Sequence, residues 1–538
     1  MKHNNSFKNI ILPLVIAVSV IAGLLIGWYL PGKKTLHSIS GFTPVNDKTG
    51  NIITLIDAKY VDEVNLTDLE EAAIPAMLKK LDPHSVYIPA RDLSKANEPL
   101  RGNFEGIGIT FNMITDTILV MSTIPGGPSE KVGLLAGDKI IYVGDSLVAG
   151  RNITDENIIG MLKGPRGTTV KVRIHRKGVA SLLPFDIVRD KIPINTIDVA
   201  YMVNETTGYI KINTFSVTTF KDFMTALKEL KTNGMTNLIL DLRGNSGGVM
   251  EPALNLADQF LTAGQMIVYT EGRSYPREEI KATDSGEFHD GGLVVLIDEL
   301  SASASEIVAG ALQDNDRGTI MGRRSFGKGL VQEQINFKDG SGMRLTIARY
   351  YTPTGRSIQK TYDNGFDEYY NDLSVRFLHG EFQVADSIHM PDSLKFRTPG
   401  GKTVYGGGGI MPDIFVPIDT TGISDYFLRV RNSSMILRYA LRYTDENREL
   451  LKNFKAVDEL EKYLDSQSLL DKFTAFAEVN GIKRDLEGIK TSGYLIHIQV
   501  KAYIARNILD NKGFFPIWED LDSTLKIAID LFSDTTKL

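Results

Sequence analysis

The chain has 538 residues, too many for one hydrophobic core, and its length indicates about three or four domains. Its 42% hydrophobic and 23% charged residues are typical of globular protein. The formal net charge is −6 and the sequence has no basic stripe, so we do not expect nucleic acid as a partner. The absence of cysteine excludes a disulfide framework, a cysteine nucleophile and thiolate metal sites.

An uncharged apolar run near the N-terminus has the length of a membrane span. At about 1.5 Å per residue, residues 10–30 reach roughly 30 Å, the thickness of a bilayer core. Trp28 and Tyr29 lie at its outer end, where interfacial aromatic residues are common. We expect a transmembrane anchor at 10–30, after a cytoplasmic N-terminus at 1–9 and before a linker at 31–50. The alternative is a cleaved signal peptide, but the run is long for one and lacks a clear cleavage site.

The rest of the chain changes pattern several times. Helical periodicity at 51–100 predicts helices that stop before Asp82-Pro83, and residues 101–190 have the pattern of short strands broken by Gly and Pro. Between 191 and 360 strands and helices alternate, which predicts an α/β domain with partly parallel strands. The expected strands are 208–215, 237–242, 293–298 and 319–322, and the expected helices are 218–230, 250–261 and 303–313. Residues 361–421 have an irregular pattern, and residues 422–538 return to helical patterning without a chemical motif.

The segment Ser301-Ala-Ser-Ala-Ser-Glu306 lies where an apolar strand passes into a helix. Ser303 would be exposed at the sheet edge, and the helix N-terminus beside it would offer unpaired N–H groups to a developing oxyanion. Ser303 is therefore a candidate nucleophile. The alternative is an inert capping box between Ser303 and Glu306.

A serine nucleophile needs a base, and the eight histidines stand singly in no recognisable motif. Lys328 lies between two glycines, which let the backbone approach neighbouring groups, and burial could depress the pKa of its amine. Gln332 follows four residues later. In a straight strand the two side chains would be roughly 13 Å apart, so we expect a kink or bulge at Gly329 that lets Gln332 orient the amine. The alternatives are a solvated lysine and a solvent-facing glutamine.

Two glycine-rich segments complete the candidates in the α/β region. The loop 241–248 follows a strand, and its Gly247-Gly248 backbone could supply an oxyanion-hole N–H, although it could also be an ordinary strand-to-helix loop. Residues 322–328 match the start of a phosphate-binding loop. That match lacks the Ser or Thr expected at Gly329 and precedes a predicted strand rather than a helix, so nucleotide hydrolysis is not favoured.

The strand-rich region carries a possible peptide-binding loop. A glycine loop before a strand can turn backbone N–H groups toward a carboxylate, while an extended peptide adds beside that strand. The residues concerned are Phe104, Glu105, Gly106, Ile107, Gly108 and Ile109. A second motif, Gly133-Leu-x-x-Gly-Asp-x-Ile140, follows about thirty residues later. Together they predict a PDZ-like domain, although any small β-barrel with glycine turns is an alternative.

Taken in order, these motifs resemble the C-terminal processing peptidases of the tail-specific, S41 type. The matching stretches are 81–87, 104–109, 133–140, 208–216, 241–248, 301–306 and 325–332. The resemblance implies an α/β peptidase core of the ClpP/crotonase type at 191–360, completed by 361–421. It also implies an inserted PDZ β-barrel-like domain at 101–190, between the helical segment and the core, and it does not cover the helical C-terminal region.

The resemblance also implies roles for individual residues. It makes Ser303 the nucleophile, Lys328 the base and Gln332 its assistant. The oxyanion hole would be formed by Gly247 or Gly248 together with Ala304. The family commonly has proline where this chain has Ser246, and Asp314 matches a family aspartate with at most a supporting role.

The implied function is a serine endopeptidase that cleaves exported proteins near their C-termini, using a Ser–Lys dyad and no metal or cofactor. Its partners would be proteins or peptides with apolar C-termini, captured by the PDZ domain, and a second copy of the chain or an adaptor protein is possible. The expected location is the inner membrane, with the catalytic domain in the periplasm or otherwise outside the cytoplasm. The alternative is a membrane-tethered PDZ scaffold with an inactive peptidase core.

Overall fold

The computed structural model describes residues 47–113, 116–388 and 390–533, in two compact units at 1–73 and 74–538. The anchor expected at 10–30 and most of the linker expected at 31–50 lie outside the described residues. Within the described ranges, no helix is both long and apolar enough to cross a membrane. The first unit contains α2 (Lys48–Lys59), where Gly50 N–H donates to the Asp47 carboxylate at 2.8 Å. The boundary falls inside α3 (Leu66–Leu78), which ends before Asp82 as predicted.

The strand-rich region folds into an antiparallel sheet in the order β3-β4-β5-β7-β8, with β6 paired to β5. Along β7 buried and exposed residues alternate strictly, because successive side chains point to opposite faces of a strand. Val170, Val172 and Ile174 are the buried ones and join the core of this domain. The elements are α4 (Ala90–Arg101), β2 (Asn103–Gly106), β3 (Ile109–Met113), β4 (Ile118–Thr123), α5 (Pro128–Lys131), β5 (Lys139–Val143), β6 (Ser146–Leu147), α6 (Asp155–Leu162), β7 (Thr169–His175), β8 (Leu183–Val188) and β9 (Asp190–Pro193). Strands β2 and β9, where the chain enters and leaves, pair with each other.

The peptidase-like region is built on a second sheet in the order β10-β11-β12-β15-β16-β21. Only the β10–β11 pair is antiparallel, and the other pairs are parallel, as the alternation of strands and helices predicted. The elements are β10 (Ile197–Met202), β11 (Thr207–Ile212), α7 (Thr219–Thr232), β12 (Asn237–Asp241), α8 (Met250–Asp258), β15 (Gly292–Ile297), α9 (Ala304–Asp314), β16 (Thr319–Gly322) and β21 (Ile414–Phe415). The predicted elements agree with these to within about three residues, the margin expected at element ends.

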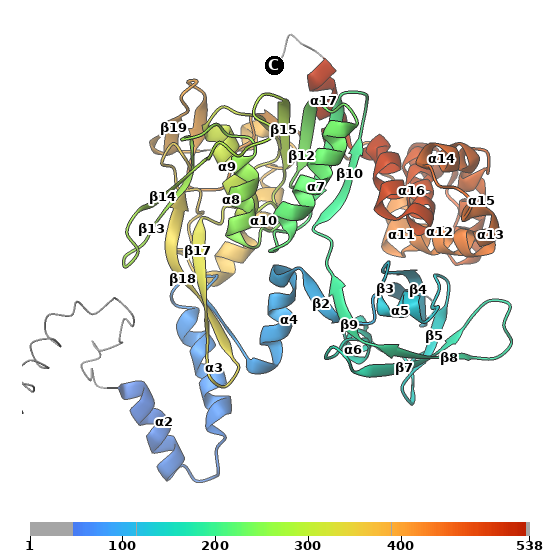
Figure 1. The fold of residues 1–538 in the computed structure, drawn as a ribbon, viewed down its shortest axis with the longest axis horizontal. Helices are drawn as coiled ribbons and strands as arrows, with labels where there is room; N and C mark the ends of the chain where they lie inside the picture. The colour runs from blue at the N-terminus through green and yellow to red at the C-terminus, as the bar shows by residue number, and fades with distance from the viewer. Residues whose placement is uncertain (1–46, 114–115, 389, 534–538) are drawn as a thin grey trace, which may run out of the picture. The chain divides into compact units, whose positions relative to one another are not determined.

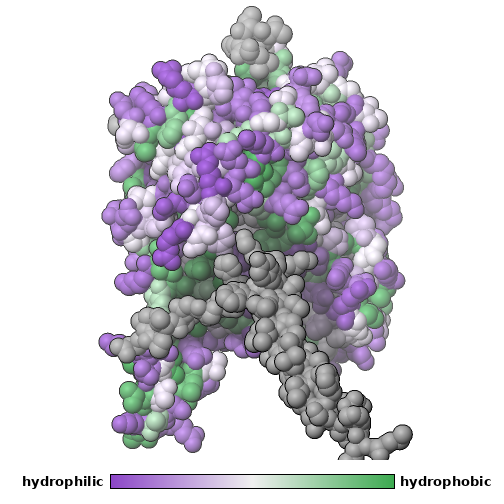
Figure 2. All heavy atoms as spheres, turned by 60° about the vertical axis from the view of Figure 1, so that its left-hand side comes forward, coloured by the Kyte–Doolittle hydropathy of each residue, from purple (hydrophilic) through white to green (hydrophobic). Residues whose placement is uncertain are grey.

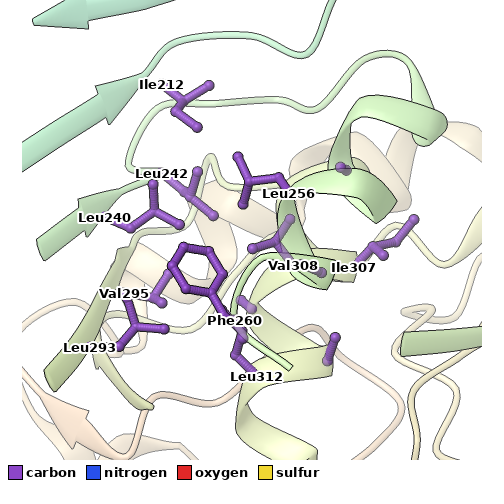
Figure 3. Packing of buried hydrophobic residues seen from close by; sticks show 14 of the residues in the cluster. Ile212, Leu240, Leu242, Leu256, Phe260, Leu293, Val295, Ile307, Val308 and Leu312 are labelled. Carbon is purple, nitrogen blue, oxygen red and sulfur yellow. The ribbon is translucent and has the colours of Figure 1, made fainter. Parts of the chain in front are cut away.

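Both faces of this sheet are covered. Alternate residues of β12 and β15, such as Leu240 and Val295, pack with α7, α8 and α9 on one face. Figure 3 shows these strand side chains directed at Leu256 of α8, at Phe260 just after that helix, and at Val308 of α9. The intervening residues, Ile239, Val294 and Leu296, pack with Leu525, Ala528 and Leu531 of α17 (Ser523–Ser533). The last described helix therefore packs on the central sheet, although it comes from the C-terminal helical region.

A third sheet brings distant segments beside the central one. It has the order β1-β18-β13-β14, with β17 paired to β18. Its strands are β1 (Val86–Ile88), β13 (Met266–Glu271), β14 (Glu278–Lys281), β17 (Leu330–Asn336) and β18 (Gly342–Tyr351). Because β1 pairs with β18, the segment around residues 82–88 lies against the hairpin that follows Lys328.

The expectation of an irregular segment at 361–421 is only partly met. It contains the 13-residue helix α10 (Phe366–Leu378), the short helices η1 (Ala385–Ser387) and η2 (Asp392–Leu394), and the paired strands β19 (Lys395–Arg397) and β20 (Thr403–Tyr405). Helix α10 buries few apolar residues. Polar contacts, including Lys360 Nζ to Asp372 at 2.9 Å and Arg376 Nε to Glu381 at 2.9 Å, hold it together with ring contacts of Tyr369 and Phe377. Such contacts leave no apolar period in the sequence.

The C-terminal region is helical, as predicted. Figure 1 shows α11 to α16 grouped in one bundle, and their buried side chains form a core of their own. The elements are α11 (Asp425–Asn432), α12 (Met435–Glu446), α13 (Arg448–Leu451), α14 (Val457–Asp465), α15 (Leu469–Val479), α16 (Leu486–Trp518) and η3 (Glu519–Leu521). On the molecular face in Figure 2, hydrophilic residues predominate and hydrophobic ones occur in smaller groups, since most large apolar side chains lie in these cores.

Candidate active site

Ser303 lies between β15 and α9 in a strained turn. Its φ is +56°, whereas a residue that caps a helix ordinarily has extended backbone geometry. A positive φ at a non-glycine residue costs free energy and occurs most often at functional turns, including the sharp turn that presents a nucleophilic serine. The capping-box contact offered as an alternative is also present, because Ser303 N–H donates to Glu306 Oε2 at 2.8 Å. A simple cap does not account for the strained backbone.

Glu306 connects the serine turn to the lysine loop. Its carboxylate is fully buried and accepts four hydrogen bonds. Oε2 accepts from the amides of Ser303 at 2.8 Å and Lys328 at 2.9 Å. Oε1 accepts from Ser325 Oγ at 2.5 Å and the Gly327 amide at 2.8 Å. Burial raises the pKa of Glu306 to about 6, and these hydrogen bonds oppose the rise. One carboxylate thus sets the backbone positions of both Ser303 and Lys328.

Tyr350 of β18 makes a second bridge between the same two residues. Its hydroxyl lies 3.1 Å from the Ser303 carbonyl oxygen and 2.6 Å from the Lys328 carbonyl oxygen. The side chain is buried, and burial raises the pKa of Tyr350, so the hydroxyl keeps its proton to donate. Sequence reasoning missed this residue, because Tyr350 belongs to none of the motifs and a single tyrosine carries no signal of such a contact.

The Lys328 amine is half-buried and donates to Gln332 Oε1 at 3.0 Å, so the predicted contact is confirmed. Burial, followed by the charge of Arg344, lowers the pKa of Lys328 below its ordinary value. The bulge was expected at Gly329, but the irregularity in the β17–β18 pairing falls between Val331 and Gln332. The register skips Ile347 there, so the extra residue lies on β18, opposite the strand that carries Gln332.

Gln332 is itself held by the segment before β1. Its Nε2 donates to the His84 backbone carbonyl, and His84 Nε2 lies 2.8 Å from the Tyr369 hydroxyl. Burial and the nearby charge of Lys328 lower the pKa of His84 to about 4, so the imidazole is neutral at pH 7. The Asp82 carboxylate fixes this turn by accepting the amides of His84 and Ser85, each at 2.8 Å. The Asp-Pro-His-Ser sequence predicts such a turn, but not its contact with Gln332.

The three residues predicted for the oxyanion hole lie together but differ in availability. The Gly247 amide donates to Asn245 Oδ1 at 2.8 Å. Within the described part of the chain, the amides of Gly248 and Ala304 donate to no acceptor. Gly247 packs against the serine turn so closely that a Cβ on it would lie 2.8 Å from Ser303 Cβ. Gly248 and Ala304 therefore have N–H groups available to an oxyanion, whereas Gly247 is the residue that packs most closely on Ser303.

The predicted peptide-binding loop is shorter in the structure than in the sequence. Phe104, Glu105 and Gly106 belong to β2, which pairs with β9. The loop itself comprises Ile107 and Gly108, whose amides donate to no acceptor among the described residues. Ile109 opens β3, which lies at the end of its sheet and is paired only with β4. An open strand edge beside free amides is the arrangement that peptide addition requires.

Two other sequence features have structural explanations. The segment after Lys328 is strand β17, so the possible phosphate-binding loop lacks the helix N-terminus that would hold a phosphate. Asp314 lies in a fully buried ion pair, 2.7 Å from Arg356 Nη2. Asp314 therefore holds the fold of the region behind α9 rather than contacting Lys328 or Ser303.

Comparison with known proteins identifies the regions of the chain. The model of peptidase family S41 matches residues 206–367, a PDZ domain model matches residues 106–185, and a family of unknown function (DUF8443) matches residues 426–510. A carboxy-terminal-processing protease of Bartonella bacilliformis is 39% identical over 317 residues, which cover 58% of this chain and 71% of that protein. The carboxy-terminal processing protease CtpA of Bacillus subtilis is 33% identical over 350 residues, covering 64% of this chain and 74% of that protein.

Among solved structures, a photosystem II D1 C-terminal processing protease is 25% identical, with a TM-score of 0.35, and covers 68% of this chain and 92% of that one. The two curated relatives align over most of their own length, and the family models match the regions that hold the strained serine turn and the open strand edge. The chain therefore belongs to the carboxy-terminal processing proteases of peptidase family S41 and is a serine-type peptidase.

Proposed function

We propose that this peptidase uses Ser303 as nucleophile and neutral Lys328 as general base to cleave exported proteins near their C-termini. The main support is the environment of the Lys328 amine. This amine is half-buried and donates to the neutral amide oxygen of Gln332, and burial lowers its pKa. An amine without a carboxylate partner loses its proton more readily than a solvated lysine, as a general base must.

In the proposed mechanism, the Lys328 amine takes the Ser303 proton and the alkoxide attacks the peptide carbonyl. The amides of Gly248 and Ala304 stabilise the oxyanion, and the protonated amine then donates its proton to the leaving nitrogen. Water hydrolyses the acyl-enzyme. Gln332, fixed through the His84 carbonyl, keeps the amine directed at the serine.

Substitution of the two residues tests this assignment. Wild type, Ser303→Ala and Lys328→Ala, each without residues 1–30, would be incubated with an unfolded protein that has an apolar C-terminus, and the products read by mass spectrometry. Lys338→Ala, which changes an exposed lysine in the β17–β18 turn, is the matched control. Cleavage by wild type and the control alone supports the dyad, and equal cleavage by all four proteins refutes it.

The proposal assigns substrate capture to the PDZ domain. The free amides of Ile107 and Gly108 would hold the terminal carboxylate, and the peptide would add to the open edge of β3. A peptide with an apolar C-terminus should bind, and its C-terminal amide should bind at least tenfold more weakly, measured by fluorescence anisotropy. Equal affinities would contradict carboxylate capture. The scaffold alternative is not favoured, because the curated relatives are proteases.

We also propose that residues 10–30 anchor the protein in the inner membrane, with the catalytic region outside the cytoplasm. The support is the apolar run and its terminal aromatic residues. The full chain should remain in the membrane pellet after alkaline carbonate extraction, and a chain without residues 1–30 should not. Release of the full chain by carbonate would contradict an anchor.

A further inference from the structure

The loop that bears the oxyanion glycines is tied to the far end of the chain. Arg243, which follows β12, donates through Nη1 to Asp522 Oδ1 at 2.8 Å and through Nη2 to Asp522 Oδ2 at 2.6 Å. This is a two-point contact of the kind that fixes both position and orientation. The Arg243 and Asp522 side chains are only 17% and 15% exposed, so solvent screens the pair weakly.

Asp522 is held in place independently of Arg243. Its Oδ1 accepts the amide of Leu525 at 3.0 Å in the first turn of α17, and its own amide donates to the Glu519 carbonyl oxygen at 3.0 Å. Helix α17 is fixed in turn by packing on the central sheet through Leu525, Ala528 and Leu531. The Asp522 carboxylate is therefore held by the first turn of α17, and α17 is held by its packing on the central sheet.

The charges around Arg243 are balanced only when Asp522 is present. Arg243 and Lys211 carry two positive charges, and the fully buried Asp241 carries one negative charge. Burial acts to raise the pKa of Asp241, but the charges of Arg243 and Lys211 outweigh it and hold that pKa below its ordinary value. With Asp241 ionised, Asp522 supplies the second negative charge. Its removal would leave Arg243 and Lys211 to share the single carboxylate of Asp241, which lies 2.7 Å from Arg243 Nη2.

The backbone after Arg243 leads through a short loop to residues that contact the serine turn. Lys211 Nζ donates to the Arg243 carbonyl oxygen at 2.9 Å, which fixes the start of the loop. Asn245 then bonds to the Gly247 amide at 2.8 Å, while its carbonyl oxygen accepts the Ala302 amide at 3.0 Å. Gly247 packs on Ser303. A shift of Arg243 would pass along the backbone through Asn245 to Gly247, which packs on Ser303, and to its neighbour Gly248.

We propose that Asp522, through its two-point contact with Arg243, is a positioning residue that sets the oxyanion loop for catalysis. The segment after residue 510 then contributes to catalysis by positioning the oxyanion loop. Asp522 lies outside the matches to the S41 family, at 206–367, and to the family of unknown function, at 426–510. This inference rests on the proposed use of Ser303 and on an oxyanion hole that includes Gly248.

The test is Asp522→Asn, because asparagine can still cap α17 through its oxygen but loses the charge and the second oxygen that accepts from Arg243 Nη2. Cleavage of a quenched-fluorescence peptide with an apolar C-terminus would be measured as kcat and KM, beside urea unfolding. A misplaced loop should lower kcat by about tenfold to a hundredfold and leave KM unchanged. Asp522→Glu should recover most of kcat, and Asp520→Asn, at an exposed neighbour, should match wild type.

A purely structural role would lower the urea midpoint without changing kcat of the folded fraction, and an unchanged kcat in Asp522→Asn overturns the inference. Should that variant not fold, the double variant Arg243→Gln with Asp522→Asn removes the Arg243 charge as well. Wild-type kcat in the double variant would overturn the inference, and a lowered kcat with unchanged KM would support it. No cleavage by wild type would instead refute the proposed function, so the two failures are distinguishable.

Discussion

Substitution of Glu306 by glutamine tests whether one carboxylate holds the serine turn and the lysine loop together. Each carboxylate oxygen accepts two hydrogen bonds, whereas a glutamine amide has only one accepting oxygen. The least costly orientation places the NH2 group toward Ser325, whose hydroxyl can rotate. The Gly327 amide is then left without an acceptor, and three remaining contacts lose the charge that strengthens them.

The magnitude follows from these contacts. One buried amide left without an acceptor costs about 1–3 kcal/mol, and loss of the charge costs about 1 kcal/mol for each of the three remaining bonds, of which the one to Ser325 is reversed. Against this, the neutral side chain avoids the burial cost that raises the pKa of Glu306 to about 6, about 2 kcal/mol. We expect a net destabilisation of about 2–4 kcal/mol, together with a fall in kcat.

The assay pairs urea unfolding with peptidase kinetics on Glu306→Gln and on Glu251→Gln, an exposed control in the first turn of α8. Unfolding free energy within about 1 kcal/mol of wild type, with kcat within about twofold, would refute the reasoning. The pH dependence provides a second check. Because the folded-state pKa of Glu306 is raised, this group contributes more stability as pH falls through about 6, and the glutamine variant should lack that contribution.

Three further predictions address neighbouring groups. Because the general base must be neutral and burial lowers the pKa of Lys328, wild-type activity should rise with pH at lower values than for a surface lysine, and a flat pH–rate profile would count against this base. Gln332→Glu places a carboxylate beside the amine, raises its pKa and should move the rise to higher pH, whereas an unmoved or lowered profile would contradict the contact. Asp314→Ala leaves Arg356 as an unpaired buried cation and should lower the unfolding free energy by about 3–5 kcal/mol in urea, so a loss under 1 kcal/mol would contradict the buried pair.

The sequence by itself determined the parts that depend on local chain properties. Apolar periodicity located the strands and helices between 207 and 322, because side-chain direction alternates every two residues in strands and every three to four in helices. Glycine and small-residue motifs located the serine turn, the lysine and the glycine pair. The contact between Lys328 and Gln332 was predicted on the assumption of a bend at Gly329, and the structure has the contact but places the irregularity between Val331 and Gln332.

Only the tertiary structure decided which distant groups meet at these motifs. The contacts of Glu306 with Ser325 and Gly327, of Tyr350 with both backbones, and of Gln332 with His84 join segments from 19 to 248 residues apart. Helix α10 was missed because it buries only Tyr369 and Arg376 and is held by polar and single ring contacts, which give no apolar period. The contact between Arg243 and Asp522, 279 residues apart, shows the reason most clearly. A charge pair leaves no period in a sequence, because its partners are chosen by the packing of sheet and helix and not by their spacing along the chain.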